Sequence, residues 1–469
     1  MNTLIRGNIT PEQAEEIRKA LEVGYGVAPY GLVPDNLARV GGSALAFESV
    51  DRTLKVLTYR EENIIFWREI PKYKAQSPVE MYITLESYGA FGNAFWGEGI
   101  TPQARDSVYR RRASFMKYMG VLKEVSLPAV ITPMVVEDIV ARENINGILW
   151  LLRQLEWSLF YGDSKLTPSG LSQDGLEFDG LATWSENKID LKGNQLTEEV
   201  LKESAFMVQS AWGIPNRFYT NPAVIASFAS NFTNAQRVLM PTPNTVSAGV
   251  VVDVYHTPAG KLLFRGDLFL QYATIKPEDV VEGQTQENFL SISAQPSHPA
   301  TAQAPVNKWN TVNPSVSSVR YKVIAVAGDN VRGRVISNVV ETNQFDITDN
   351  NNVVQFDIQL TRKTEYVYVF RMDNNSGRYG LIARVSHPDM VGTTPATITI
   401  VDRNERIPNT YDGFVFELSE QTMKFAQLHD AIKINLAVVS PAFRWIILLS
   451  GGLIVFAPKR VVHIKNIGV

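Results

Sequence analysis

The sequence predicts an α+β protein in which a long amphipathic helix leads into a mixed α/β section, followed by an all-β segment. Apolar residues recur at three- and four-residue spacing through residues 138–161, which is the period of one helix face. Apolar and polar residues alternate through residues 79–86, which is typical of a half-buried strand. Residues 315–406 hold little besides strand and turn patterns. The predicted helix face comprises Ile145, Ile148, Leu149, Leu152, Leu155, Leu159 and Phe160.

The composition is that of a globular protein with a substantial core. The chain has 469 residues, of which 45% are hydrophobic and 20% charged, so two or three domains are expected. It contains no cysteine, which excludes disulfides, thiolate metal sites and a cysteine nucleophile. The formal net charge of −3 argues against a protein whose affinity is dominated by phosphate neutralisation. Stability is therefore expected to come from packing and subunit association.

Neither end of the chain predicts contact with a membrane. A helix-start signal, Thr10-Pro11-Glu12, precedes a charged helix over residues 11–23 without the apolar core of a secretory signal, so we expect the product to stay in the cytoplasm. Residues 445–457 are uncharged and apolar, but they fall short of the roughly 20 residues that span a bilayer. A buried pair of strands is predicted there, and a transmembrane helix is the lesser alternative.

The N-terminal quarter of the chain is expected to be extended. Residues 1–59 combine the short helix with closely spaced glycines and prolines, which indicates an arm that needs a neighbour to lie on. Residues 60–120 are predicted to form a long β excursion whose tip carries Phe91, Phe95 and Trp96 among glycines. A solvent-facing loop rarely exposes such aromatics unless another surface covers them. We expect a neighbouring subunit to do so; the alternative is that the aromatics fold back into their own core.

A basic cluster lies within the same excursion. Arg110, Arg111 and Arg112 are consecutive and favour ionic contact with acidic neighbours such as Glu61 and Glu62, or with another subunit. A solvated strand face is the equally weighted alternative.

The section after the long helix predicts two further helices and several short strands. Residues 197–212 place Val200, Leu201, Ser204 and Val208 on one face and stop at a glycine. Asn221-Pro222 is an N-cap followed by a first-turn proline, which opens a second helix.

The all-β segment is expected to be a separate inserted module. Residues 294–314 hold Pro296, Pro299, Pro305 and Pro314 among Ser, Thr, Ala and Gln, which indicates a linker leading into it. The strand spacing of the next ninety residues suggests a β-sandwich of immunoglobulin or fibronectin type III character, without the disulfide. Because the mixed α/β pattern resumes afterwards, the module is an insertion whose two ends lie close together.

Motifs for catalysis or metal binding are not found. The five histidines are scattered singly, and no phosphate-cradling loop or nucleophile elbow occurs. Glu156 with Asp163, or Glu177 with Asp179, could be imagined as an acid and base pair, but acidic pairs of this kind are common in all proteins. No catalytic residue, cofactor or metal site is predicted, and the protein is not expected to be an enzyme.

Three segments follow one another in an informative order: the long helix with its exit Leu-Phe-Tyr-Gly-Asp at residues 159–163, the Gly-Leu-Glu-Phe-Asp-Gly-Leu loop at 175–181 and Lys-Gly-Asn-Gln-Leu-Thr at 192–197. In this order they show a resemblance to the major capsid proteins of tailed phages, most closely those of large contractile-tailed phages. It extends over most of the chain, from residues 24–26 to 457–459. The resemblance implies an HK97-like fold divided as follows: N-terminal arm 1–59; extended loop 60–120; peripheral domain 121–193 and 445–469 with spine helix 138–161; axial domain 194–295 and 407–444; inserted sandwich 296–406.

The function implied by this resemblance is self-assembly. The family builds an icosahedral head of hexamers and pentamers around double-stranded DNA, and associates with portal, scaffolding and sometimes decoration proteins. The candidate contact residues between subunits are Phe91, Phe95, Trp96, Arg110, Arg111, Arg112, Glu61 and Glu62.

Two other functions remain open from the sequence. A phage tail or adhesin protein would use the sandwich to bind a host surface and would form trimers. A polysaccharide hydrolase with an accessory sandwich would need a cleft with two converging carboxylates. If the sandwich is an accessory, replacing residues 300–406 by a short Gly-Ser linker should leave a soluble, assembling protein.

Overall fold

The computed structural model describes residues 60–127, 139–166, 176–230, 241–242, 245–246, 253–329, 333–362, 364–386, 396–436 and 441–469. Within the first range, Asn93, Trp96, Ile100, Pro102 and Gln103 are excepted. The predicted N-terminal arm and its helix lie outside the described residues.

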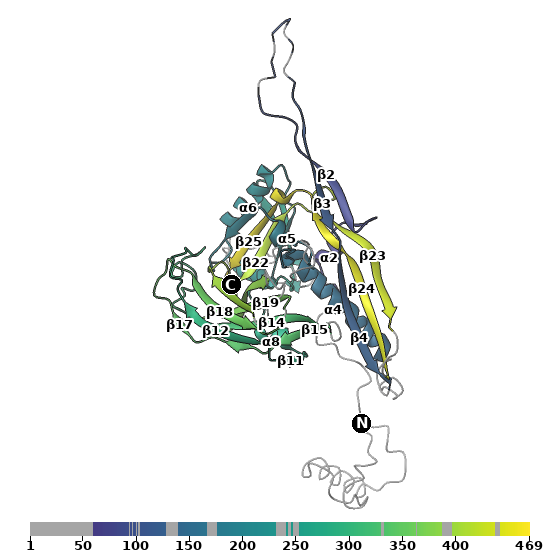
Figure 1. Cartoon of the computed structure of the whole chain (residues 1–469). Helices are drawn as coiled ribbons and strands as arrows, with labels where there is room; N and C mark the ends of the chain where they lie inside the picture. The colour runs from purple at the N-terminus through teal and green to yellow at the C-terminus, as the bar shows by residue number, and fades with distance from the viewer. Residues whose placement is uncertain are drawn as a thin grey trace, which may run out of the picture. The chain divides into compact units, whose positions relative to one another are not determined.

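The predicted long helix is confirmed as α4, Ile139–Tyr161 (Figure 1). Its buried face is Leu151, Leu155, Leu159 and Phe160. Ile145 and Ile148, which were predicted to share that face, are 48% and 40% exposed, so the N-terminal half of the helix buries less than its pattern suggests.

A four-stranded sheet packs along this helix, in the order β1-β23-β24-β4 (Figure 1). Close approach between helix and sheet explains a glycine in mid-helix: a Cβ on Gly147 would lie 2.8 Å from the side chain of Ile447. The strands are β1 Lys72–Lys74, β23 Met423–Asn435, β24 Ala442–Val455 and β4 Lys117–Ser126.

The apolar C-terminal segment forms one strand of this sheet, so the predicted pair of strands is wrong. Gly451 and Gly452 lie inside β24 and do not form a turn. A Cβ on Gly451 would lie 2.4 Å from the ring of Phe425, so glycine there reflects close packing. Among the described residues, no helix is long and apolar enough to cross a membrane.

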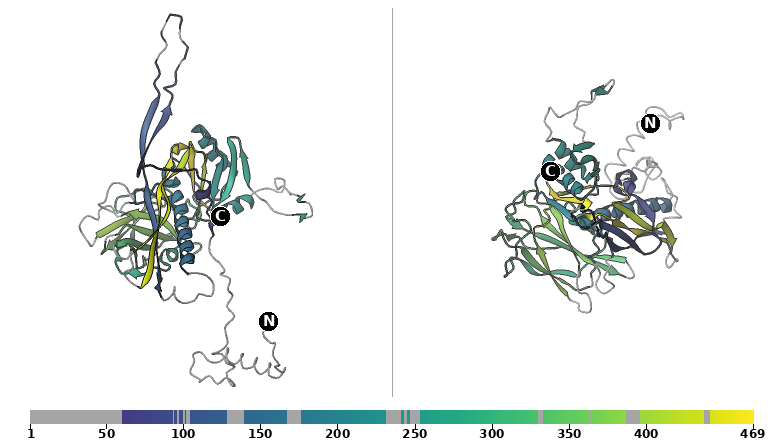
Figure 2. Two further views of the ribbon diagram at one scale, coloured as in Figure 1. Left: turned by 90° about the vertical axis from the view of Figure 1, so that its right-hand side faces the viewer. Right: turned by 90° about the horizontal axis from the view of Figure 1, so that it is seen from above.

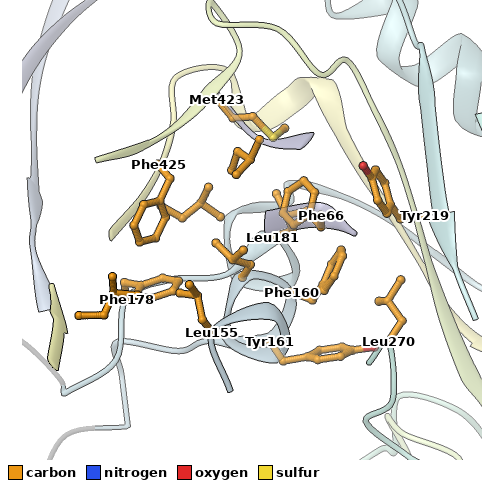
Figure 3. Close-up of a cluster of buried hydrophobic side chains, with 14 of the residues drawn as sticks. Phe66, Leu155, Phe160, Tyr161, Phe178, Leu181, Tyr219, Leu270, Met423 and Phe425 are labelled. Atoms are coloured by element: carbon orange, nitrogen blue, oxygen red, sulfur yellow. The ribbon is translucent and has the colours of Figure 1, made fainter. Parts of the chain in front are cut away.

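One large cluster of buried side chains joins the helix to both of its neighbouring sheets (Figure 3). At its centre the rings of Phe66 and Phe160 lie 4.9 Å apart, and Tyr219 meets Phe66 edge-on at 5.1 Å. Such aromatic pairs add about 1 kcal/mol each beyond the area they bury. Phe178 and Leu181, from the loop at residues 176–181, lie in the same cluster.

The loop after the helix is held by two glycines in contact. The amide of Gly180 donates to the carbonyl of Gly162 at 2.9 Å. A Cβ on Gly162 would lie 2.2 Å from the carbonyl oxygen of Phe178, so no larger residue fits without backbone movement.

A six-stranded sheet in the order β5-β25-β22-β6-β10-β9 forms the next unit. The two predicted helices are confirmed as α6, Glu198–Ser210, and α7, Pro222–Ser230, with the Asn221 side chain accepting from the amide of Ala223 at 3.1 Å. The strands are β5 Asn187–Asp190, β25 Val461–Ile467, β22 Tyr411–Phe416, β6 Arg217–Thr220, β10 Gly260–Gly266 and β9 Val254–Thr257.

Strand pairing departs from the predicted domain division at two places. Strand β23 was expected in the axial domain, yet it pairs with β24 beside the long helix. Strand β25 was expected in the peripheral domain, yet it pairs with β22 and β5 in the six-stranded sheet. Periodicity finds strands but does not indicate which distant strand each one pairs with.

The all-β segment forms two facing sheets with a shared core, which we call the β module, residues 286–402 (Figure 2). One sheet has the order β11-β15-β14-β19-β20, with β16 beside β14; the other is β12-β18-β21. The strands are β11 Gln286–Glu287, β12 Leu290–Ser297, β14 Tyr321–Asp329, β15 Gly333–Ser337, β16 Val340–Glu341, β18 Val354–Leu360, β19 Tyr366–Met372, β20 Tyr379–Ser386 and β21 Ala396–Asp402, with a separate pair β13 Ser318–Val319 and β17 Phe345–Asp346.

The predicted linker is part of this module. Strand β12 pairs with β18 through Ser297, and Trp309 is completely buried, with its indole N–H donating to the carbonyl of Asn352 at 2.8 Å. The four prolines among small and polar residues therefore predict a linker in a segment that is in fact packed.

The remaining elements are short. They are η1 Glu61–Asn63, α2 Phe66–Glu69, α5 Leu181–Trp184, β7 Pro241–Thr242, β8 Thr245–Val246, α8 Pro277–Val281 and η3 Pro458–Arg460.

Candidate assembly surfaces

The predicted β excursion is an antiparallel hairpin with one apolar face. Strand β2, Val79–Ser87, pairs with β3, Val108–Phe115, so that Ile83 lies opposite Arg111 and Leu85 opposite Tyr109. Alternate residues of a strand share a face, and Ile83 is 69% exposed. The apolar face comprises Val79, Met81, Ile83, Leu85, Tyr109, Ala113 and Phe115.

The opposite face of the hairpin carries its ion pairs. Arg110 and Arg112 each lie within 3.3 Å of a carboxylate oxygen of Glu86. The register explains this pairing, because these three side chains lie on the same face of the ladder. The predicted acidic neighbours, Glu61 and Glu62, lie in η1 and are exposed.

Arg111 points to the apolar face instead, with Nη2 2.9 Å from the sulfur of Met81. The three consecutive arginines therefore do not form one cluster, since alternate residues of a strand face opposite ways.

The tip of the hairpin exposes its aromatics. Phe91 is fully exposed and Phe95 is 90% exposed in the subunit, whereas Trp96 lies outside the described residues. The alternative in which Phe91 and Phe95 return to the core of their own subunit therefore does not describe this structure.

A second apolar surface was not found in the sequence. The four-stranded sheet has one face on helix α4; on its outer face, Leu122, Ile446 and Ile434 are neighbours across three strands. Leu448 and Ile432 form the adjacent row, beside Gly120. Leu122, Ile434 and Ile432 are 52%, 45% and 42% exposed. We call Leu122, Ile432, Ile434, Ile446 and Leu448 the outer strip.

The sequence of β4 carries only a weak signal of this surface. Its alternate residues Tyr118, Gly120, Leu122 and Glu124 share the outer face, and they mix apolar and polar types. The strip becomes contiguous only because β4 pairs with β24 and β24 pairs with β23. A local sequence pattern does not predict this pairing.

The carboxylates considered as catalytic pairs have structural partners. Glu156 is buried and accepts three backbone amides, those of Ile65, Phe66 and Trp67, at 2.6–2.8 Å. Glu177 pairs with Arg384 of the β module at 2.8 Å, and Asp179 accepts the amide of Ser164 at 2.8 Å. These contacts position chain segments. In the described ranges, no group of three or more histidines and carboxylates is arranged to hold a metal ion.

A buried network joins the end of helix α4 to the last strands. Asp412 accepts from the Tyr161 hydroxyl at 2.8 Å and pairs with Arg406 at 2.5 Å. His463 Nε2 lies 3.3 Å from the same carboxylate, and its ring stacks on Phe414 at 4.5 Å. Burial alone would raise the pKa of Asp412, but Arg406 and the hydrogen bonds outweigh it and hold that pKa well below its usual range. Burial lowers the pKa of His463.

A cleft of about 520 Å³ lies between this network and the β module. It is lined by Arg384, Arg403 and Arg406 together with Asp163, Asp402 and Glu405. Arg371 pairs with Asp402, and Lys465 pairs with Glu405. Asp402 and Glu405 are therefore already neutralised, and Asp163 accepts the backbone amide of Lys165 at 2.9 Å, so these acids have structural partners and do not form the converging carboxylate pair of a glycoside hydrolase.

Known proteins resemble the chain over nearly its full length. A family model described as SU10 major capsid protein matches residues 132–281. The major capsid proteins of Staphylococcus phage K and Staphylococcus phage S25-3 are each 28% identical over 466 residues, covering 97% of this chain and 95% of the relative.

Solved structures similar to the chain include a capsid of a native GTA particle computed with C5 symmetry. It has a TM-score of 0.48 and 6% identity, and covers 93% of this chain and 100% of the other. A chain from Mycobacterium phage Bobi gives a TM-score of 0.47 at 7% identity, covering 92% and 99%.

The sequence match to full-length relatives agrees with what the subunit exposes: an amphipathic hairpin and an apolar sheet face that remain without cover, and acids committed to structural contacts. The chain belongs to the major capsid proteins of tailed phages.

Proposed function

We propose that this subunit assembles through its hairpin, which lies with its apolar face on a neighbouring copy. In this proposal the chain has the HK97-like subunit plan and forms the hexamers and pentamers of an icosahedral head shell. The shell encloses double-stranded DNA in the virion and is built in the host cytoplasm. The observation that carries the proposal is the exposure of Met81, Ile83 and Phe91 on one projecting hairpin.

The energetic reason is that this apolar surface has no cover in the single subunit. Burying an exposed Leu, Ile or Met side chain contributes roughly 1.5–3 kcal/mol. A hairpin face that carries Met81, Ile83 and Leu85 can therefore supply a large part of one contact between subunits. Each subunit would make that contact once as donor and once as acceptor, and the contacts accumulate around a closed shell.

We infer that the outer strip is the surface that accepts the hairpin. It presents aliphatic side chains at strand spacing, which matches the alternate side chains of the hairpin. Arg444 and Glu124 form an ion pair at its border, 2.9 Å apart, and would form part of the polar rim usual at protein interfaces.

Other partners follow from the role of a head subunit. Portal and scaffolding proteins, and a decoration protein where one exists, are the expected protein partners. Double-stranded DNA would be a non-specific neighbour inside the shell and would be held weakly, because a net charge of −3 offers little phosphate neutralisation. The β module is proposed to be an inserted sandwich of the immunoglobulin or fibronectin type III class.

The test compares two substitutions on adjacent residues of one strand. Ile83→Lys places a charge on the apolar face, and Thr84→Lys places the same charge on the polar face. Both residues are at least partly exposed, so both variants should fold with unchanged melting temperature. We expect Ile83→Lys to abolish assembly, measured by sedimentation and negative-stain microscopy, whereas Thr84→Lys assembles. Equal assembly of the two variants would contradict the proposal.

A further inference from the structure

The base of the hairpin is tied to the long helix by one side chain. Helix α2, which precedes β1 and the hairpin, begins with three backbone N–H groups that have no partner within the helix. Glu156 Oε1 accepts from Ile65 at 2.8 Å and from Phe66 at 2.6 Å, and Oε2 accepts from Trp67 at 2.8 Å. The Glu156 side chain comes from the middle of the buried cluster and is itself 0% exposed.

A second buried carboxyl group lies against the first. Asp267, which is also 0% exposed, is within hydrogen-bonding distance of Glu156. Its Oδ1 accepts the amide of Phe269 at 2.8 Å. Its Oδ2 is buried and meets no donor group among the described residues. Two buried carboxylates in contact repel strongly, so a proton must lie between them to supply the missing donor.

The charged groups around Glu156 and Asp267 do not supply the missing donor. Lys72 lies near Glu156 but stacks its ammonium 4.0 Å over the Trp67 ring. The carboxylate of Glu69 is already paired with Arg217 and Arg265, and it accepts from the Tyr219 hydroxyl. On the other side, the Tyr161 hydroxyl is directed to Asp412.

We infer that Glu156 is the positioning residue that fixes the base of the hairpin on the long helix, and that it does so only while it shares a proton with Asp267. The inference rests on the proposed function for its purpose, since the segment it holds leads into the proposed contact hairpin. The hold itself is a property of the single subunit and is tested there.

The direction of the pH dependence follows from the burial of the pair. Burial is the main cause that raises the pKa of Asp267 to about 6, and burial together with the neighbouring Asp267 raises the pKa of Glu156 well above its usual value. A carboxyl group whose pKa is raised by folding stabilises the fold below its unfolded pKa, and that stabilisation is lost as the pH rises through the folded pKa. The hold on α2 should therefore weaken as the pH rises through the raised pKa values of the pair, and it should be lost once Glu156 has given up the last shared proton.

Hydrogen exchange of the Ile65, Phe66 and Trp67 amides in the isolated subunit, corrected for intrinsic exchange rates, tests this inference. In the natural protein we expect protection to fall with rising pH, by up to about tenfold per pH unit for each proton that the closed segment keeps and the opened segment has lost, and to level off once the pair has lost its last proton. Asp267→Asn supplies a permanent N–H donor in the same shape, so its protection should stay high and become independent of pH. Glu156→Gln cannot accept from all three amides, so protection should fall at every pH.

The amides of β4 serve as the internal control and should not change in either variant. Protection that is independent of pH in the natural protein, or a Glu156→Gln variant that stays fully protected, would overturn the inference. A failure of Ile83→Lys to block assembly would leave this result unaffected, so the two ideas are tested separately.

Discussion

Arg384 of the β module and Glu177 of the loop after helix α4 form an ion pair that joins two regions of the fold. Arg384 Nη1 lies 2.8 and 3.0 Å from the two carboxylate oxygens of Glu177, and Nη2 donates to the carbonyl of Tyr161 at 2.8 Å. The guanidinium also lies 4.6 Å from the centre of the Trp157 ring. The Arg384 side chain is only 3% exposed, so the β module is fastened to the end of the long helix.

Replacing Arg384 by alanine should therefore destabilise the subunit. Loss of one partner leaves the Glu177 carboxylate and a backbone carbonyl without their donor, which costs about 3 kcal/mol in such settings. Arg320→Ala is the matched control, because its ion pair with Glu341 is about 40% exposed on both sides and exposed pairs contribute about 0–1 kcal/mol. Urea denaturation of the two variants measures the difference. Equal midpoints would mean that the junction contributes little.

The ion pair between Arg384 and Glu177 also changes the result that we expect when the β module is removed. Replacement of residues 300–406 would take away Arg384 and Arg406 and leave the carboxylates of Glu177 and Asp412 without their arginine partners. It would also leave β11 and β12 without the strands they pair with. We expect this deletion to produce an unfolded or aggregated subunit, seen as loss of the cooperative melting transition. A soluble deletion variant with a sharp transition would restore the view that the module is a separable accessory.

Charged substitutions in the outer strip should block assembly without unfolding the subunit. Ile434→Lys introduces a charge where 45% of the residue is already exposed, so little stability is lost. Val401→Lys is the control, because Val401 is 36% exposed in β21 of the β module. Sedimentation velocity should find shells or capsomers for Val401→Lys and only subunits for Ile434→Lys. Assembly by both variants would remove the outer strip from the interface.

Acid should weaken the network around Asp412 through His463. Burial lowers the pKa of His463 relative to its ordinary value near 6.5, despite the opposing effect of Asp412. Below about pH 6.5 the unfolded chain therefore takes up a proton that the folded chain resists, and stability falls as the pH falls. The stability contributed by Glu156 and Asp267 changes with pH in the opposite direction, so a His463 variant must be compared with the natural protein at each pH.

The measurement is the melting temperature between pH 7.5 and pH 5. His463→Phe keeps the ring stacked on Phe414 and removes the titrating group, so the acid-side fall should be smaller than in the natural protein. His256→Gln, at an exposed position in β9, is the control. If the melting temperatures of the natural protein and of His463→Phe fall equally, His463 is not responsible for the loss of stability in acid.

Elements governed by local periodicity could be predicted from the sequence. Helix α4, helix α6 and the amphipathic strand β2 lie where their apolar spacing placed them. Pairing between distant segments cannot be predicted in this way, and the apolar run at residues 445–457, predicted to form two strands, lies in a single strand as far as Val455. The linker prediction for residues 294–314 rests on four prolines among Ser, Thr, Ala and Gln and includes Trp309, although a completely buried tryptophan belongs to a core.

The same distinction between local patterns and distant pairing applies to the candidate assembly surfaces. Ile83 and Phe91 belong to a local pattern, so an exposed contact hairpin could be anticipated from residues 60–120. Glu156 carried no such signal, since its three amide partners lie about ninety residues earlier in the chain. The outer strip combines residues of β4, β23 and β24 and becomes visible only when their register is known.

The most direct test of the central claim is a cryo-electron microscopy reconstruction of the assembled protein. The account predicts rings of five and six subunits in which Met81, Ile83 and Leu85 of one copy lie against Leu122, Ile434 and Ile446 of the next. A reconstruction in which this hairpin face remains in solvent, or particles that are only monomers or trimers, would contradict it.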